Sequence, residues 1–128
     1  MQNNQVRHGS WISWSCRPWR VKAVTYSDGI KVTLEGREYT LIHIADLQPI
    51  EMTEQICEQI GLAYKMGEYT TEGAWKFCYD IRKKIFNAWK VKQGQVVERV
   101  MKRTECLHII QSILLDCGIY EFEKNIAL

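Results

Sequence analysis

The chain has 128 residues, of which 46% are hydrophobic and 25% are charged, with a formal net charge of +2. These values fit one globular domain and argue against a disordered chain. No apolar run approaches the roughly 18 residues that cross a bilayer, and the N-terminus lacks the apolar stretch of a signal peptide. We therefore expect a cytoplasmic protein without membrane association, whose five cysteines are reduced thiols.

The N-terminal block, residues 6–50, is predicted to form short β-strands. Apolar and polar residues alternate in four segments spaced about ten residues apart. Asp28-Gly29 marks a hairpin turn, because this pair readily adopts positive φ angles. Pro49 cannot donate to a central ladder, so it belongs to an edge or a turn. The block predicts a small barrel or a strongly bent meander.

A short linking helix is predicted over residues 53–61. Thr53 is a favourable N-cap, and Gly61 is a residue on which helices commonly end. The polar residues 64–73, which include two glycines, are expected to form a loop.

The last part of the chain is predicted to form a β-meander over residues 75–103 and a helix over residues 104–117. Alternating apolar residues separated by turn-like segments indicate the meander, and apolar residues at spacings of three and four indicate the helix. Tyr120 and Phe122 alternate with glutamates, which is compatible with a last short strand. The whole chain, residues 1–128, is thus expected to be one α+β domain.

No pattern typical of catalysis or metal binding occurs in the sequence. The three histidines His8, His43 and His108 have no metal-ligand spacing with each other or with a cysteine. Cys106 and His108 lie two apart at a predicted helix start, where such positions point to different faces. We therefore expect no enzyme, no catalytic residue, no metal and no cofactor, although a pair assembled only by folding stays an alternative.

Basic residues concentrate in one segment. Residues 75–105 contain nine basic and three acidic residues, giving +6 in a chain whose total is +2. Aromatic residues alternate with these cations, a combination that nucleic-acid platforms use. The competing and more frequent interpretation places Trp75, Phe77 and Tyr79 on a core face. The candidate nucleic-acid contacts are Arg82, Lys83, Lys84, Lys90 and Lys92.

Tryptophans cluster near the N-terminus, where Trp11, Trp14 and Trp19 fall within nine positions. By alternation, Trp14 shares a face with Ile12 and Trp11 lies on the opposite face. An exposed aromatic ring on a small barrel would suit a protein partner or a base. The alternative is that the ring packs under residues 64–73 or under the C-terminal helix. Trp11 and Trp19 are the candidate partner-binding residues.

Three motifs occur together along the chain. Gly9-Ser10-Trp11 lies at the first strand, Asp46-Leu47-Gln48-Pro49-Ile50-Glu51-Met52-Thr53-Glu54-Gln55-Ile56 spans the linking region, and Leu107-His108-Ile109-Ile110-Gln111 lies in the last helix. They resemble the G-x-W-like strand, the D-L-x-P-I-x-L-T-E-x-I segment and the L-H-x-x-Q helix of an uncharacterised family of short bacterial proteins. That family is common in gut-type genomes and on prophages and mobile elements, and the order and spacing agree over most of the chain.

The resemblance implies an SH3-like N-terminal barrel, a linking helix, a meander and a terminal helix. It brings no assigned activity and no catalytic residue. His108 and Gln111 share a helix face at i,i+3, and we expect them to hydrogen-bond the barrel or a loop, since buried polar groups need partners. The family setting adds the idea of binding a host defence component.

Taken together, the sequence favours a non-enzymatic accessory binding protein of bacterial or phage origin that contacts a protein partner. The alternative is a nucleic-acid-binding protein that uses residues 75–105. The identity of the partner and the oligomeric state stay open, since an exposed edge strand can also pair with a copy of itself.

Overall fold

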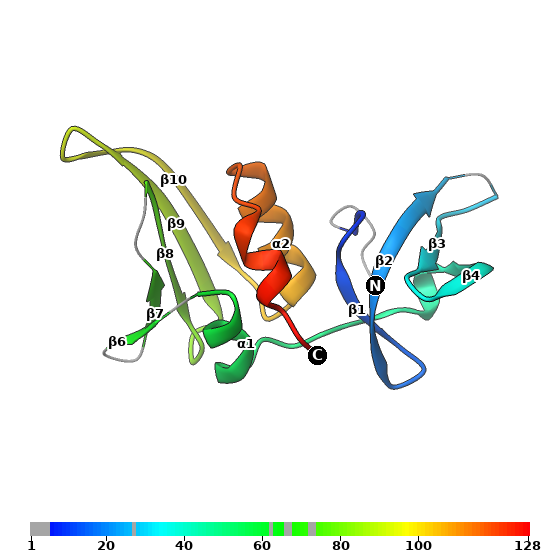
Figure 1. Ribbon diagram of the computed structural model, residues 1–128. Coiled ribbons are helices and arrows are strands. Elements are labelled where there is room, and N and C mark those ends of the chain that lie inside the picture. Colours follow the sequence, from blue (N-terminus) through cyan, green and yellow to red (C-terminus); the bar gives the residue numbers. More distant parts are fainter. Residues whose placement is uncertain (1–5, 27, 62, 66–67, 72–73) are drawn as a thin grey trace. The chain divides into compact units, whose positions relative to one another are not determined.

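The computed structural model describes residues 6–26, 28–61, 63–65, 68–71 and 74–128. The chain groups into two compact units, which we call unit 1 (Met1–Glu51, Cys106–Asp116 and Leu128) and unit 2 (Met52–Glu105 and Cys117–Ala127). Each unit contains one five-stranded antiparallel sheet together with helical segments, so the α+β class is confirmed (Figure 1). The single domain expected from the length stays a prediction. No helix in the described ranges is long and apolar enough to cross a membrane.

The sheet of unit 1 has the strand order β4-β3-β2-β1-β5. Its elements are β1 (Trp11–Trp14), β2 (Arg17–Thr25), β3 (Lys31–Leu34), β4 (Arg37–His43), the 3-10 helix η1 (Ile44–Asp46) and β5 (Gln48–Pro49). The predicted strands of residues 6–50 are therefore present, and Pro49 lies on an edge strand as expected. Within the described residues the two end strands, β4 and β5, do not pair with each other, so a closed barrel is not found.

The core of unit 1 is made by alternate strand residues, as period-2 patterning requires. Ile12 on β1 and Val21 on β2 are fully buried, and Ile42 on β4 is buried between the exposed Leu41 and His43. The complete cluster of buried apolar residues is Val6, Ile12, Val21, Val32, Leu34, Ile42, Ile44 and Leu47.

Helix α2 (Leu107–Asp116) also belongs to unit 1, and it begins later than the predicted residue 104. The backbone N–H of Leu107 donates to the carbonyl of Ile50 at 2.8 Å, and Glu51 forms a β-bridge with Cys106. Extended pairing therefore takes the hydrogen-bonding groups that a helix start at Thr104 would have used.

The sheet of unit 2 has the strand order β10-β9-β8-β7-β6. Its strands are β6 (Ala63–Lys65), β7 (Glu68–Thr71), β8 (Trp75–Asp80), β9 (Ile85–Lys92) and β10 (Gln95–Arg103). The predicted meander over residues 75–103 is confirmed as β8, β9 and β10. The loop predicted over residues 64–73 is wrong where the structure describes it, because β6 and β7 form there; their tyrosines and threonines favour strands in spite of their polarity.

The helical parts of unit 2 are short. Helix α1 (Glu54–Gln59) has the predicted N-cap, since the hydroxyl of Thr53 accepts the backbone N–H of Ile56 at 3.2 Å. Residues predicted as a last strand form instead the 3-10 helix η2 (Glu121–Asn125). The Gln59 side chain holds this end of the unit, donating to the carbonyl of Ala127 at 3.0 Å and accepting its N–H at 3.2 Å.

Candidate functional site

The candidate partner-binding tryptophans lie on two faces of the β1–β2 hairpin. The register pairs Trp11 with Arg20 and Ile12 with Trp19, so the side chains of Trp11 and Trp19 point to opposite faces. Trp14 and Trp19 pack against the core cluster and meet edge to face, with ring centroids 6.2 Å apart. Trp11 and Trp19 therefore do not belong to one contact surface.

Arginines lie over all three of these rings. The guanidinium-to-centroid distances are 5.9 Å for Arg20 over Trp11, 5.5 Å for Arg17 over Trp19 and 4.3 Å for Arg37 over Trp14. A cation in this position is attracted by the negative face of the ring. All three rings are half-buried, and the indole N–H groups of Trp11 and Trp19 are buried without an acceptor in the described residues. These tryptophan rings therefore already make contacts within unit 1, and only part of each ring is accessible to a partner.

The Gln111 side chain joins the last helix to the N-terminal segment of unit 1. Its Oε1 accepts the backbone N–H of Trp11 at 2.8 Å, and its Nε2 donates to the carbonyl of Gly9 at 3.1 Å. Arg7 makes a second connection to this helix, because its guanidinium group donates to the carbonyl of Ser112 at 2.9 Å and to Asp116 Oδ1 at 3.0 Å. The expectation that Gln111 hydrogen-bonds the N-terminal block is confirmed, and its role is structural.

His108 is buried in α2, with 2% of its surface exposed. Burial disfavours the charged imidazolium and lowers the pKa of His108 from 6.5 to about 4. Its Nδ1 has no hydrogen-bond partner within the described ranges, so the hydrogen bond expected from the sequence is not found at this atom. A neutral, enclosed imidazole beside Leu107 is a core residue.

The predicted nucleic-acid contacts do not lie together. Arg82 and Lys83 are exposed in the β8–β9 turn, where their backbone N–H groups both donate to Asp80 Oδ1 at 3.0 Å. The ammonium group of Lys84 forms an ion pair with Glu105. Of the other two candidates, Lys90 is half-buried opposite Trp75 on β8, and Lys92 ends β9 at the far end from this turn.

One face of the unit 2 sheet is apolar and buried. On β8, Phe77 and Tyr79 are buried and lie opposite Ala88 and Phe86 of β9. The rings of Phe77 and Phe86 stack with centroids 6.2 Å apart. The core interpretation is therefore confirmed for Phe77 and Tyr79, which are not available for stacking on bases, whereas Trp75 is half-buried.

The opposite face of the same sheet carries cations around a tryptophan. Trp89 of β9 lies directly between Lys76 of β8 and Arg99 of β10. The next rows along the strands are Cys78–Asn87–Met101 and Asp80–Ile85–Arg103. We call these nine residues the basic face.

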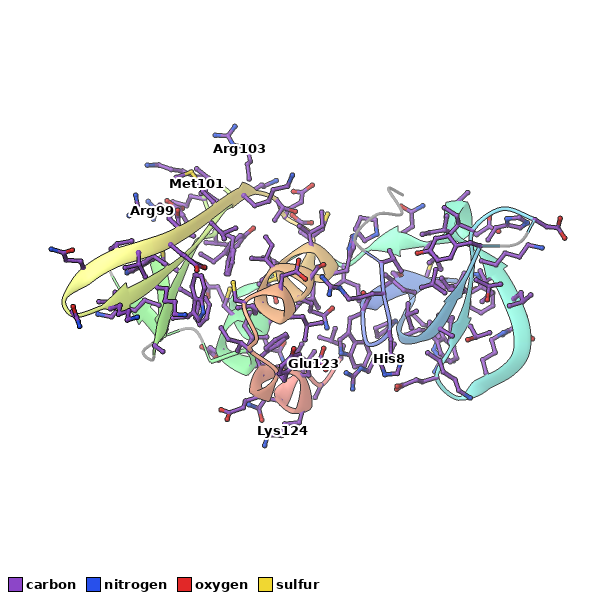
Figure 2. The ribbon with its side chains drawn as sticks, turned by 90° about the horizontal axis from the view of Figure 1, so that it is seen from above. His8, Arg99, Met101, Arg103, Glu123 and Lys124 are labelled. Carbon is purple, nitrogen blue, oxygen red and sulfur yellow. The ribbon has the colours of Figure 1, made fainter. Side chains whose placement is uncertain are left out.

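The protruding groups of the basic face are accessible. Lys76, Arg99 and Arg103 are exposed, Met101 is 61% exposed, and Trp89 is half-buried. Figure 2 shows Arg99, Met101 and Arg103 projecting from β10 to the same side. Among the described residues, the side chains of Lys76, Arg99 and Arg103 have no ion-pair or hydrogen-bond partner. These three cations are therefore available to an anionic ligand.

Sequence reasoning missed this arrangement because of a β-bulge. Val96 pairs with Val91, but Glu98 rather than Val97 pairs with Lys90, so the register shifts by one residue. An unbroken hairpin counted from the turn would have placed Arg99 on the buried face. The bulge instead places Arg99 beside Trp89.

Neither a metal-ligand cluster nor a known relative indicates what the basic face binds. The described part of the chain holds no group of three or more His, Cys, Asp or Glu residues that would bind a metal ion. No protein-family model, curated protein or solved structure matches the chain. The chemistry of the basic face therefore rests on its own geometry.

Proposed function

We propose that this protein is a non-enzymatic binding protein that holds single-stranded nucleic acid on the basic face of unit 2. The observation that carries the proposal is the row in which Trp89 lies between Lys76 and Arg99. Side chains directly opposite each other in neighbouring strands have Cβ atoms roughly 5 Å apart. A base stacked on Trp89 thus has a cation on each side for the adjoining phosphates, which is how single strands are held without sequence preference.

A single strand fits this face better than a duplex does. In a duplex the bases stack on each other, so Trp89 finds no free base to stack on. Arg99 and Arg103 are four residues apart on β10, which corresponds to roughly 13 Å at the usual strand rise. An unpaired strand that follows β10 meets both guanidinium groups, with Met101 between them.

The variants Trp89→Leu and Arg99→Gln/Arg103→Gln test the proposal in a binding assay with a short labelled single strand. Loss of stacking should weaken binding by about tenfold or more. Loss of two phosphate contacts should weaken binding and also reduce the slope of log affinity against log salt by about 1.4 for a single strand. The pair Lys22→Gln/Lys124→Gln is the control, because it removes the same charge from exposed positions outside the basic face.

The turn variant Arg82→Gln/Lys83→Gln separates the basic face from the candidates favoured by the sequence. Binding within about twofold of wild type is expected, since both cations lie in the β8–β9 turn rather than beside Trp89. If this variant loses most of the affinity while Arg99→Gln/Arg103→Gln keeps it, the turn is the site and the proposal is wrong.

A protein partner on unit 1 is the second candidate function, as an accessory protein of bacterial or phage origin that contacts a host defence component. It is supported by the row Arg37–Trp14–Trp19–Arg17, whose residue types dominate binding hot spots. Arg17 is exposed, so Arg17→Ala should leave the thermal unfolding midpoint within about 2 °C while a captured partner is lost. If the Arg17→Ala variant still binds the partner, this row of side chains is not the contact surface.

We also propose an SH3-like arrangement for unit 1 and a cytoplasmic location. The SH3-like arrangement is supported by the order of the strands. After the β2–β3–β4 meander, β5 pairs with β1 at the end of the sheet opposite to β4. The cytoplasmic location is supported by the cysteine pattern of the sequence, an odd number without C-x-x-C spacing, which suits a reducing compartment.

A further inference from the structure

Strand β10 is an edge strand of the unit 2 sheet. It ends the sheet order of unit 2, and it is nine residues long. Eight of the nine residues are exposed, and Val100 is half-buried. A long exposed edge presents a row of unpaired N–H and C=O groups that can pair with another strand.

We propose that β10 pairs antiparallel with β10 of a second copy of this chain, about a twofold axis through Val100. In such a pair the axis stands perpendicular to the sheet, so residues directly opposite each other come from the same face of each copy. With Val100 opposite itself, Glu98 lies opposite Lys102 of the second copy, and the same pair occurs again across the axis. Opposite charges placed in this way stabilise a pair of strands.

Each other centre either places like charges opposite each other or pairs only a few residues of β10. Centres at Glu98, Arg99, Lys102 or Arg103 oppose each of these residues with itself, and a centre at Met101 opposes Arg99 with Arg103. Centres at Gln95, Val96 or Val97 lie at the start of the strand or on the bulge, so they pair at most five residues of β10. The charge sequence of β10 therefore selects Val100, and the partner is a second copy rather than an unrelated strand.

The pairing also extends the basic face. Because faces are kept across the axis, Arg99 of one copy lies opposite Met101 of the other, and the two basic faces continue into each other. This consequence rests on the proposed nucleic-acid function, whereas the pairing of the two strands does not. Self-association is therefore measured on nuclease-treated protein without nucleic acid.

The variants Glu98→Lys and Lys102→Glu test the register by sedimentation equilibrium over a concentration series. Each alone places like charges opposite each other twice, and its dimerisation should weaken by about tenfold or more. An equimolar mixture of the two variants pairs opposite charges again and should dimerise within about threefold of wild type. Glu35→Lys, an exposed change on unit 1, is the control and should dimerise as wild type does.

Three outcomes would overturn the proposal: wild type that stays monomeric at the highest concentration, single variants that dimerise like wild type, or a mixture that stays monomeric. Glu98 also lies opposite Lys90 within its own sheet, so near-ultraviolet circular dichroism confirms that each variant is folded. If Glu98→Lys does not fold, Glu98→Gln and Lys102→Gln replace the pair. Each should then weaken the dimer by about threefold, and an unchanged dimer contradicts the register.

Discussion

At the scale of single residues, His108 in α2 makes the stability of unit 1 depend on pH. His108 is held neutral by burial, with its pKa lowered from 6.5 to about 4, whereas in the unfolded chain the imidazole has its ordinary pKa. The unfolded state therefore binds the proton first, so the contribution of His108 to the free energy of unfolding is fully present above about pH 6.5 and is lost as the pH decreases toward 4. A shift of this size corresponds to roughly 3 kcal/mol over that range.

Urea unfolding at a series of pH values measures this dependence. The variant His108→Gln cannot titrate and should lose most of the decrease in stability between about pH 6.5 and pH 4. His43→Gln, at an exposed position, is the control and should retain the wild-type decrease. If wild type and His108→Gln show the same pH dependence, other groups cause the acid sensitivity.

The same helix shows how far a residue's role can be predicted from sequence. The spacing of His108 and Gln111 placed both on one face, and the need of buried polar groups for partners predicted hydrogen bonds to the N-terminal barrel or to a loop. Gln111 makes two such bonds, to Trp11 and Gly9. Nδ1 of His108 makes none in the described residues. Both side chains satisfy the helical pattern, but the partner of each depends on which backbone groups reach it after folding.

At the scale of elements, the β1–β2 turn holds two residues in a strained backbone conformation. Ser15 and Cys16 have φ angles of 54° and 61°, so this two-residue hairpin loop requires the left-handed conformation at both positions. Neither residue favours that conformation, and the cost is roughly 1 kcal/mol or more for each. No Asn-Gly or Asp-Gly pair occurs at this turn, unlike at Asp28-Gly29, so alternation alone did not predict it.

Replacing the two turn residues should stabilise unit 1. Ser15→Asn/Cys16→Gly should raise the free energy of unfolding by about 1 kcal/mol, because Asn and Gly adopt positive φ at lower cost. Thermal and urea unfolding measure the change. Gly36→Ala, at a φ of 79° with open space around it, is the opposite control and should destabilise the protein. No gain from the first variant would mean that the turn is not strained.

At the candidate site, the presence of strand β10 was predicted from the sequence, but the face on which its side chains lie was not. Alternation and turn-like segments were sufficient to predict the meander over residues 75–103, which the structure forms as β8, β9 and β10. They were not sufficient to predict which face Arg99 and Arg103 occupy, because one bulged residue reverses the assignment. The bulge places the half-buried Val100, rather than Arg99, on the same face as Ala88.

At the scale of the whole molecule, chain order and sheet order are closely related within each unit. In unit 2 every sheet neighbour is also a sequence neighbour, and in unit 1 only β5 departs from that order by returning to β1. Local patterns therefore predicted the meanders well. The periodicity of α2 alone did not tell which sheet it packs on, since Arg7–Asp116 and Gln111–Gly9 join residues about a hundred positions apart. Only the expected hydrogen bonds of His108 and Gln111 to the barrel or a loop pointed toward the N-terminal sheet.

The charge of the whole chain, +2, gives little indication of a ligand, whereas its distribution does. We have proposed that unit 2 holds single-stranded nucleic acid around Trp89. The most direct test is a two-dimensional NMR titration of the indole N–H signals of the five tryptophans with a short single strand. We predict that the Trp89 signal shifts and that those of Trp11, Trp14 and Trp19 stay in place. Shifts confined to Trp14 and Trp19, or no shift at any tryptophan, would show that Trp89 is not the binding site.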